Sequence, residues 1–199
     1  MKAAALLFPL LLAPLAIAEE VCTCADARLV NGWCAAHDVG YVAGLEIRSA
    51  ELFETLDAHG HQLDPSRLRC AQCRDAHPDG YCAEHHIGFV DGLAYLSTLT
   101  YHLAKGHAKS SSEITCPICR NNAESHGWCS KCEVGMVGNV EIRDRLDFQV
   151  ASGEYDRLLK ARETAVRCEM CAVAIIYDSE CPFCEITFKD GVPVKAQSR

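Results

Sequence analysis

The chain has 199 residues, with 19 basic and 27 acidic side chains and a formal net charge of −8 at pH 7. A chain this acidic does not attract phosphate backbones, so nucleic acid is not an expected partner. The length would suit one ordinary domain, but the 14 cysteines exceed what such a domain needs and require disulfides or metal ions as an explanation.

The N-terminus has the pattern of a secretory signal. Lys2 supplies a positive charge, residues 3–15 form an apolar run, and residues 16–18 give the small-x-small sequence that a signal peptidase cuts. The run is short for a membrane span, so a retained anchor is the less favoured alternative. We therefore predict that residues 1–18 are a signal peptide and that the mature chain is exported, periplasmic or secreted, with no further membrane span.

The cysteines form an internal repeat with four copies. Each copy has two pairs of ligand-type residues, with eight or nine residues between the pairs and two residues inside the second pair. The first cysteines of successive copies lie 48, 46 and 52 residues apart. The four sets are Cys22, Cys24, Cys34 and His37; Cys70, Cys73, Cys82 and His85; Cys116, Cys119, Cys129 and Cys132; and Cys168, Cys171, Cys181 and Cys184.

The number of these residues favours metal ions over disulfides. The 14 cysteines make four complete sets of four when His37 and His85 are added, and zinc in closed structural sites takes four such ligands. The two histidines occupy the slot that Cys132 and Cys184 fill in the later copies, and a histidine can replace a thiolate around zinc but cannot join a disulfide. We predict four zinc ions per chain. Fe and Cu(I), which thiolate-rich sites also accept, are alternatives, and seven disulfides are the less favoured explanation.

Each ion is expected to bind within one copy, because a short hairpin can return the second pair to the first. A cross-brace, in which the first and third pairs share an ion, would have to reach across a predicted helix and is the less favoured alternative. A single copy is too small for a hydrophobic core to stabilise it, whereas a structural zinc contributes about 10–16 kcal/mol in peptides.

An amphipathic helix is predicted after the ligands in each of the first three copies, from the spacing of apolar residues. Gly40 and Gly88, near the expected helix starts, indicate either a close approach of the helix to the ligand-bearing hairpin or a later start of the helix. The fourth copy lacks the residues that flank the ligands elsewhere, and we interpret it as a divergent cap. The expected helices cover residues 39–58, 87–104 and 137–167, the last either as one long helix or as two helices with a break at Ser152-Gly153.

Together these features predict small metal-stapled α+β modules in tandem. Each module is expected to have a zinc knuckle and a short hairpin followed by a helix, with no helix after the last. The predicted boundaries are residues 1–18 for the signal peptide, 19–61, 62–109 and 110–166 for three modules with a helix, 167–190 for the fourth module, and 191–199 for a flexible tail.

A short hairpin between two ligand pairs resembles treble-clef and zinc-ribbon fingers. The stretch from Cys116-Pro117-Ile118-Cys119 to Gly135-Met136 is also similar to the heavy-metal-binding domains of bacterial metal transporters. Those domains have a histidine in the first pair and no gap before the Gly-Met, and this chain departs from them at both points. The resemblance covers about 20 residues of each module; it implies metal binding and no particular partner.

Two histidine pairs outside the sets, His59 with His61 and His102 with His107, are candidates for extra surface metal sites. No nucleophile motif is present, and four complete ligand sets leave no open position for a catalytic metal-bound water, so we do not expect an enzyme. We expect a binding or scaffold protein with a protein partner that the sequence does not identify. The alternatives are metal storage or delivery outside the cytoplasm, and thiol–disulfide exchange, for which a thioredoxin-like βαβ pattern is missing.

Overall fold

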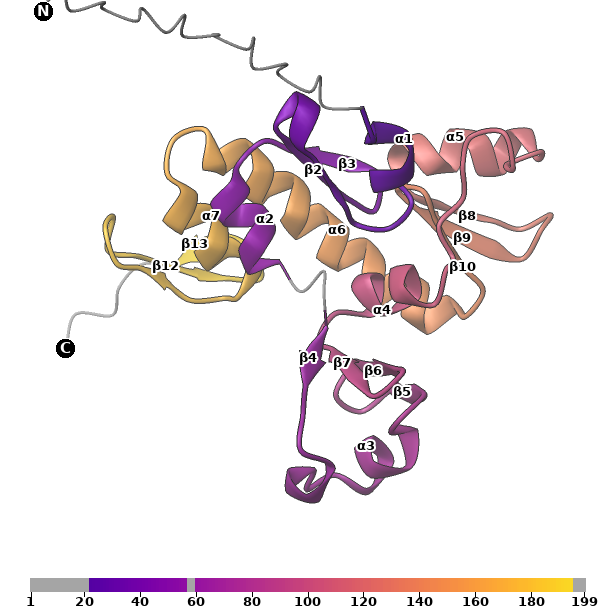
Figure 1. The fold of residues 1–199 in the computed structure, drawn as a ribbon, viewed down its shortest axis with the longest axis horizontal. Coiled ribbons are helices and arrows are strands. Elements are labelled where there is room, and N and C mark those ends of the chain that lie inside the picture. The colour runs from indigo at the N-terminus through magenta and orange to yellow at the C-terminus, as the bar shows by residue number, and fades with distance from the viewer. Residues whose placement is uncertain (1–21, 57–59, 195–199) are drawn as a thin grey trace, which may run out of the picture.

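The computed structural model describes residues 22–56 and 60–194 (Figure 1). The predicted signal peptide and residues 195–199 of the predicted tail lie outside the described residues. Within them the same unit recurs: a short helix, a three-stranded antiparallel meander, and, in the first three modules, a second helix.

The bounds of the elements follow the repeat. The first module contains α1 (Cys24–Ala27), β1 (Trp33–Cys34), β2 (Val39–Val42), β3 (Leu45–Ile47) and α2 (Ala50–Thr55). The second contains β4 (His61–Gln62), α3 (Ala71–Ala76), β5 (Gly80–Cys82), β6 (Ile87–Val90), β7 (Leu93–Tyr95) and α4 (Thr98–Ala104). The third contains α5 (Pro117–Ser125), β8 (Gly127–Cys129), β9 (Val134–Val137), β10 (Val140–Ile142) and α6 (Arg145–Ala165). The fourth contains α7 (Glu169–Ile176), β11 (Glu180–Cys181), β12 (Ile186–Lys189) and β13 (Val192–Val194).

The expected helices over residues 39–58, 87–104 and 137–167 are wrong in their first parts, where the structure has a β-hairpin. In the second module, Val90 pairs with Leu93 around the two-residue turn Asp91-Gly92. Both turn residues have positive φ, 51° and 81°, as a type I′ hairpin turn requires. Asp-Gly between apolar residues is a strong hairpin signal, and it outweighs helical spacing of the flanking apolar residues because a helix cannot accommodate two left-handed residues.

The helix of the third module is unbroken across Ser152-Gly153, so of the two alternatives, one long helix or two, the structure has the single helix α6. The Ser152 hydroxyl donates to the carbonyl of Phe148, 2.7 Å away, so this polar side chain is satisfied inside the helix. In the fourth module, β13 lies in the stretch assigned by sequence to the tail, because Asp190-Gly191 forms the same left-handed turn as Asp91-Gly92.

A glycine in the middle strand of each of the first three modules lets an aromatic ring of the following helix lie against the sheet. In the third module, a Cβ added to Gly135 would lie 2.1 Å from the Phe148 ring. Trp128 pairs with Gly135 across the strands, and its ring centroid is 5.5 Å from that of Phe148. Both interpretations of these glycines therefore hold: the helix begins later than expected, and it approaches the hairpin closely. Equivalent sets are Trp33, Gly40 and Phe53, and Tyr81, Gly88 and Tyr101.

Replacing the strand glycine should destabilise the protein. Gly135→Ala is expected to lower the free energy of unfolding by about 1–3 kcal/mol, because the new methyl group overpacks the Phe148 ring. Urea denaturation would measure the change. Gly153→Ala is the matched control, since no atom lies within 4 Å of a Cβ at this position in α6; it should stabilise by up to about 1 kcal/mol. Equal effects of the two substitutions would contradict this packing.

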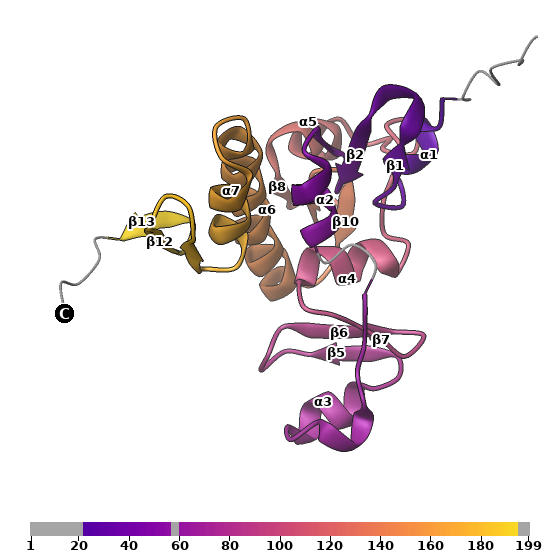
Figure 2. The same cartoon turned by 60° about the vertical axis from the view of Figure 1, so that its left-hand side comes forward.

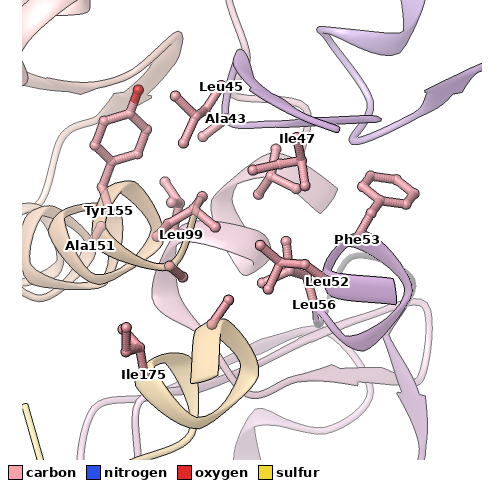
Figure 3. Close-up of a cluster of buried hydrophobic side chains, with 14 of the residues drawn as sticks. Ala43, Leu45, Ile47, Leu52, Phe53, Leu56, Leu99, Ala151, Tyr155 and Ile175 are labelled. Atoms are coloured by element: carbon pink, nitrogen blue, oxygen red, sulfur yellow. The ribbon is translucent and has the colours of Figure 1, made fainter. Parts of the chain in front are cut away.

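The second helices of the first three modules, the helix α7 and adjacent strands form one shared hydrophobic core. The cluster joins residues of the first module to α4, β9, β10, α6 and α7. Figure 3 shows Leu45, Ile47 and Leu52 of the first module facing Ala151 and Tyr155 of α6, with Leu99 and Ile175 alongside. The modules therefore follow one another along the chain but pack against one another around a common core.

Carboxylates of later helices hold the N-terminal caps of earlier ones. Glu154 of α6 accepts from the Ser97 hydroxyl at 2.9 Å and from the next two backbone N–H groups of α4 at 3.0 and 2.8 Å. Glu169 of α7 accepts from the hydroxyl of Ser49, the cap of α2, at 2.6 Å. Two of these bonds satisfy backbone N–H groups that a helix start leaves free, and the other two hold the capping serine hydroxyls, so the contacts tie the first two modules to the last two.

The ligand-bearing part of the second module stands apart from the shared core. In Figures 1 and 2, α3 and the sheet of β4–β7 lie on the far side of α4 from α6. Their small buried cluster consists of Cys73, Ala76, Cys82, Phe89 and Ala94. Among the described residues of this module, α4 contributes Leu99 and Leu103 to the shared core, and Ala108 packs against it.

The fourth module has an open face on its sheet where the other modules carry a helix. Thr187 stands at the place of the strand glycine, and Glu180 pairs with it across the strands. Lys189 on the same face is exposed, as are Val192 and Val194, which pair with Lys189 and Thr187. The face is therefore of mixed polar and apolar character.

Candidate metal centres

The structure brings together the four residues of each predicted set. In every set the four ligand atoms, one per residue, all lie within 4.8 Å of one another. Each set comes from a single module, so the first and third pairs do not share a site and the cross-brace is not formed. All 14 cysteines lie in the described ranges, and none forms a disulfide.

Two kinds of local structure position the ligands. In modules two to four the first cysteine is the N-cap of the short helix, as at Cys70, Cys116 and Cys168. The second pair occupies the tight turn between the first two strands, for example between β8 and β9. The sequence predicts a knuckle at the first pair and a hairpin between the pairs. The structure instead has a helix between the pairs and the knuckle at the second pair.

The distances within the sets fit zinc. Two sulfurs bound to one tetrahedral zinc at about 2.3 Å lie about 3.8 Å apart. The Sγ–Sγ distance is 4.0 Å for Cys116 and Cys129, 3.9 Å for Cys168 and Cys181, and 3.8 Å for Cys168 and Cys184. A disulfide would require about 2.05 Å. The residues present can therefore hold a tetrahedral ion without rearrangement of the backbone.

Burial follows one pattern in modules two to four. The first ligand is half-buried, the second and third are buried, and the fourth is exposed. The buried cysteines belong to the small hydrophobic clusters that join helix to sheet, such as that of Ile114, Cys119, Cys129, Val134 and Met136. An ion at each site would lie near the protein surface, and the buried cysteines of these clusters would hold it in place.

The thiols of one set cannot all ionise without a cation. The imidazole of His37 lowers the pKa of Cys34 to about 6, and the backbone N–H of Cys119 lowers the pKa of Cys116 to about 6. In contrast, burial and then the neighbouring thiols raise the pKa of Cys73 to about 12 and also raise the pKa of Cys119. One thiolate forms readily in a set, and a metal ion would supply the charge that the others need.

The first site differs from the others. Cys22 is exposed, and its partner in the first pair is only two positions away. The Nδ1 atom of His37 is 3.3 Å from Cys24 Sγ. Hydrogen bonding to Cys24 raises the pKa of buried Tyr41, and the Arg28 guanidinium carbon lies 4.7 Å from the centre of the Tyr41 ring. No spacing pattern in the sequence signals that this phenol faces the site.

The second site has two polar neighbours that the sequence analysis missed. The side-chain carbonyl of Gln72 accepts from the backbone N–H of Glu84 at 3.1 Å and lies 3.3 Å from Cys82 Sγ. The Glu84 carboxylate is 3.4 Å from Cys70 Sγ. Gln72 reaches the strand turn because α3 is folded against the sheet. The contact joins residues 10 and 12 positions apart, so it cannot be recognised from the sequence.

Of the two histidine pairs predicted outside the sets, the structure describes only one completely. His59 lies outside the described residues, so its pair with His61 has no structural description. His102 and His107 are in contact, with Nδ1 atoms 3.0 Å apart. Within residues 22–56 and 60–194, no fifth group of three or more Cys, His, Asp or Glu residues converges as the four sets do.

No helix in the described part of the chain combines the length and apolar character needed to cross a membrane. Comparison of the chain with protein-family models, with curated proteins and with solved structures found no match. The four Cys/His clusters, each able to hold a metal ion, support a metal-binding role for this cysteine-rich chain.

Proposed function

We propose that this chain is an exported zinc protein in which four ions act as structural staples and the assembled modules serve as a scaffold for a protein partner. The observation that carries the proposal is the position of the ligands. Each set joins the start of a short helix to the turn of a sheet, across a cluster in which cysteines are a large share of the buried residues. Such clusters are too small to hold these elements together alone, and a structural zinc supplies the missing stability.

The stoichiometry of metal tests the first part of the proposal. Protein kept reduced during purification should contain four zinc ions per chain by elemental analysis, one for each set. The intact mass of the unfolded protein should show that all 14 cysteines are free thiols. Fewer than three ions, with a mass that corresponds to seven disulfides, would overturn the assignment.

Metal storage or delivery is the second candidate, and one observation favours it. The fourth ligand of every set is exposed, at His37, His85, Cys132 and Cys184. An exposed ligand gives an acceptor protein a direct path to the ion. A carrier, however, needs an apo form that persists until it is reloaded, whereas a staple does not.

Thiol–disulfide exchange has weaker support than either metal function. The first cysteine pair of modules two to four does lie at a helix start, where thiolates are stabilised. Yet every pair converges with a second pair, so each site is a set of four ligands and not a dithiol alone. We also propose that the protein is not an enzyme, because a complete set of four ligands has no open position for a substrate or water.

A further inference from the structure

A pair of imidazoles lies outside the four sets, where the second module meets the third. His102 is in the last turn of α4, and His107 follows it after the turn at Gly106. The backbone N–H of His107 donates to the carbonyl of His102 at 3.1 Å, which places the second ring opposite the first. The two Nδ1 atoms are 3.0 Å apart. His102 is buried, whereas His107 is half-buried and keeps the pair in contact with solvent.

Asp147 of α6 fixes the orientation of the buried ring. Its Oδ2 atom is 3.3 Å from Nε2 of His102, and the two side chains are only 18% and 8% exposed. A proton on Nε2 that is donated to this carboxylate leaves Nδ1 of His102 as a lone pair directed at His107. Metal-binding histidines commonly have a carboxylate on the nitrogen remote from the ion.

We propose that His102 and His107 form a fifth, labile site for a divalent ion such as zinc or nickel, with Asp147 as a positioning residue. Two metal–nitrogen bonds of about 2.1 Å hold their nitrogens about 3.0 Å apart at the right angle of octahedral coordination and about 3.4 Å apart at the tetrahedral angle, so the observed 3.0 Å matches the first and needs only a small opening for the second. Among the described residues no third Cys, His, Asp or Glu joins the pair, so water completes the coordination. With two protein ligands in place of four, the ion is held less tightly than in the Cys/His sets.

Zinc titration of wild-type protein and of His107→Gln, both reduced and stripped of excess metal, tests the site. Calorimetry should find one equivalent more for the wild type, bound after the tighter sites are filled. Over that last equivalent, the ring nitrogen resonances of His102 and His107 should shift in ¹⁵N-detected spectra. Asp147→Asn should keep the stoichiometry but weaken the last equivalent about 10- to 100-fold, as loss of a carboxylate behind a ligand does.

His126→Gln is the matched control, because His126 also faces a carboxylate, with Nε2 3.7 Å from Asp156, but is not part of an imidazole pair. It should bind as many zinc ions as the wild type. The difference of one equivalent between wild type and His107→Gln does not depend on how many ions the Cys/His sets hold. A wrong assignment of the histidine pair can therefore be distinguished from a wrong assignment of the Cys/His sets. Equal stoichiometry in these two proteins, or ring resonances that do not move in the wild type, would show that the histidines form only a hydrogen-bonded pair.

Discussion

Cys171→Ala is expected to destabilise the whole protein, lowering its free energy of unfolding by more than about 4 kcal/mol, as loss of a structural metal can. Cys171 lies in α7 and belongs to the shared core together with Ile175 and Phe188. Without the ion of the fourth set, α7 is no longer linked to β11. The apolar contacts that α7 makes with α6 and α2 are then lost. Guanidinium denaturation of the zinc-loaded protein would measure the change.

Cys73→Ala is the matched variant, since Cys73 has the same place in its set and is equally buried, 4% exposed against 5% for Cys171. Its cluster is separate from the shared core. We therefore expect local unfolding of residues 70–95, seen as rapid hydrogen exchange there, with little change in α6. If Cys73→Ala also released α6, or if Cys171→Ala affected only residues 168–194, the division between a shared core and a separate second module would be incorrect.

Removal of metal with a strong chelator under reducing conditions is expected to cause a large loss of helical circular dichroism. The short helices α3 and α5 are held to their sheets by clusters that include the ligands themselves, so they should melt first. The lost stabilisation is large, because each structural zinc contributes about 10–16 kcal/mol in isolated peptides. Re-addition of zinc should restore the signal as the modules refold.

The same experiment separates the staple from the carrier. A carrier would keep its helices after chelation and would recover four ions rapidly, because its sites would stay formed. That outcome would favour storage or delivery over the scaffold. The helices α2, α4, α6 and α7 are the ones that could survive chelation, because they pack on one another directly in the shared core.

The ligand sets could be predicted from the sequence because they are local. Two residues separate the members of each second pair, and eight or nine separate the pairs, so each set is confined to a span of 16 or 17 residues. Over such a distance the chain has few ways to bring four ligands together. The divergence of the fourth module was visible for the same reason, as Glu180 and Thr187 replace an aromatic residue and a glycine.

The structure after each set could not be predicted from spacing alone. The apolar residues between 39 and 58 fit a helical period, but the same residues fit two short strands once Ala43 and Gly44 adopt positive φ. The turn decides between these possibilities, because two left-handed residues end any helix. The hairpin then directs Leu45 and Ile47 toward α6, a helix that begins about 100 residues later.

What the sequence determined by itself is therefore the chemistry of the four Cys/His sets, since ligand type and short spacing act within one module. The tertiary structure decided which modules share a core, which cap bonds join them, and that Asp147 meets His102 across 45 residues. These contacts form between helices that are distant along the chain, and their free energy comes from apolar surface that is buried only when the helices meet. No periodicity within a single module carries that information.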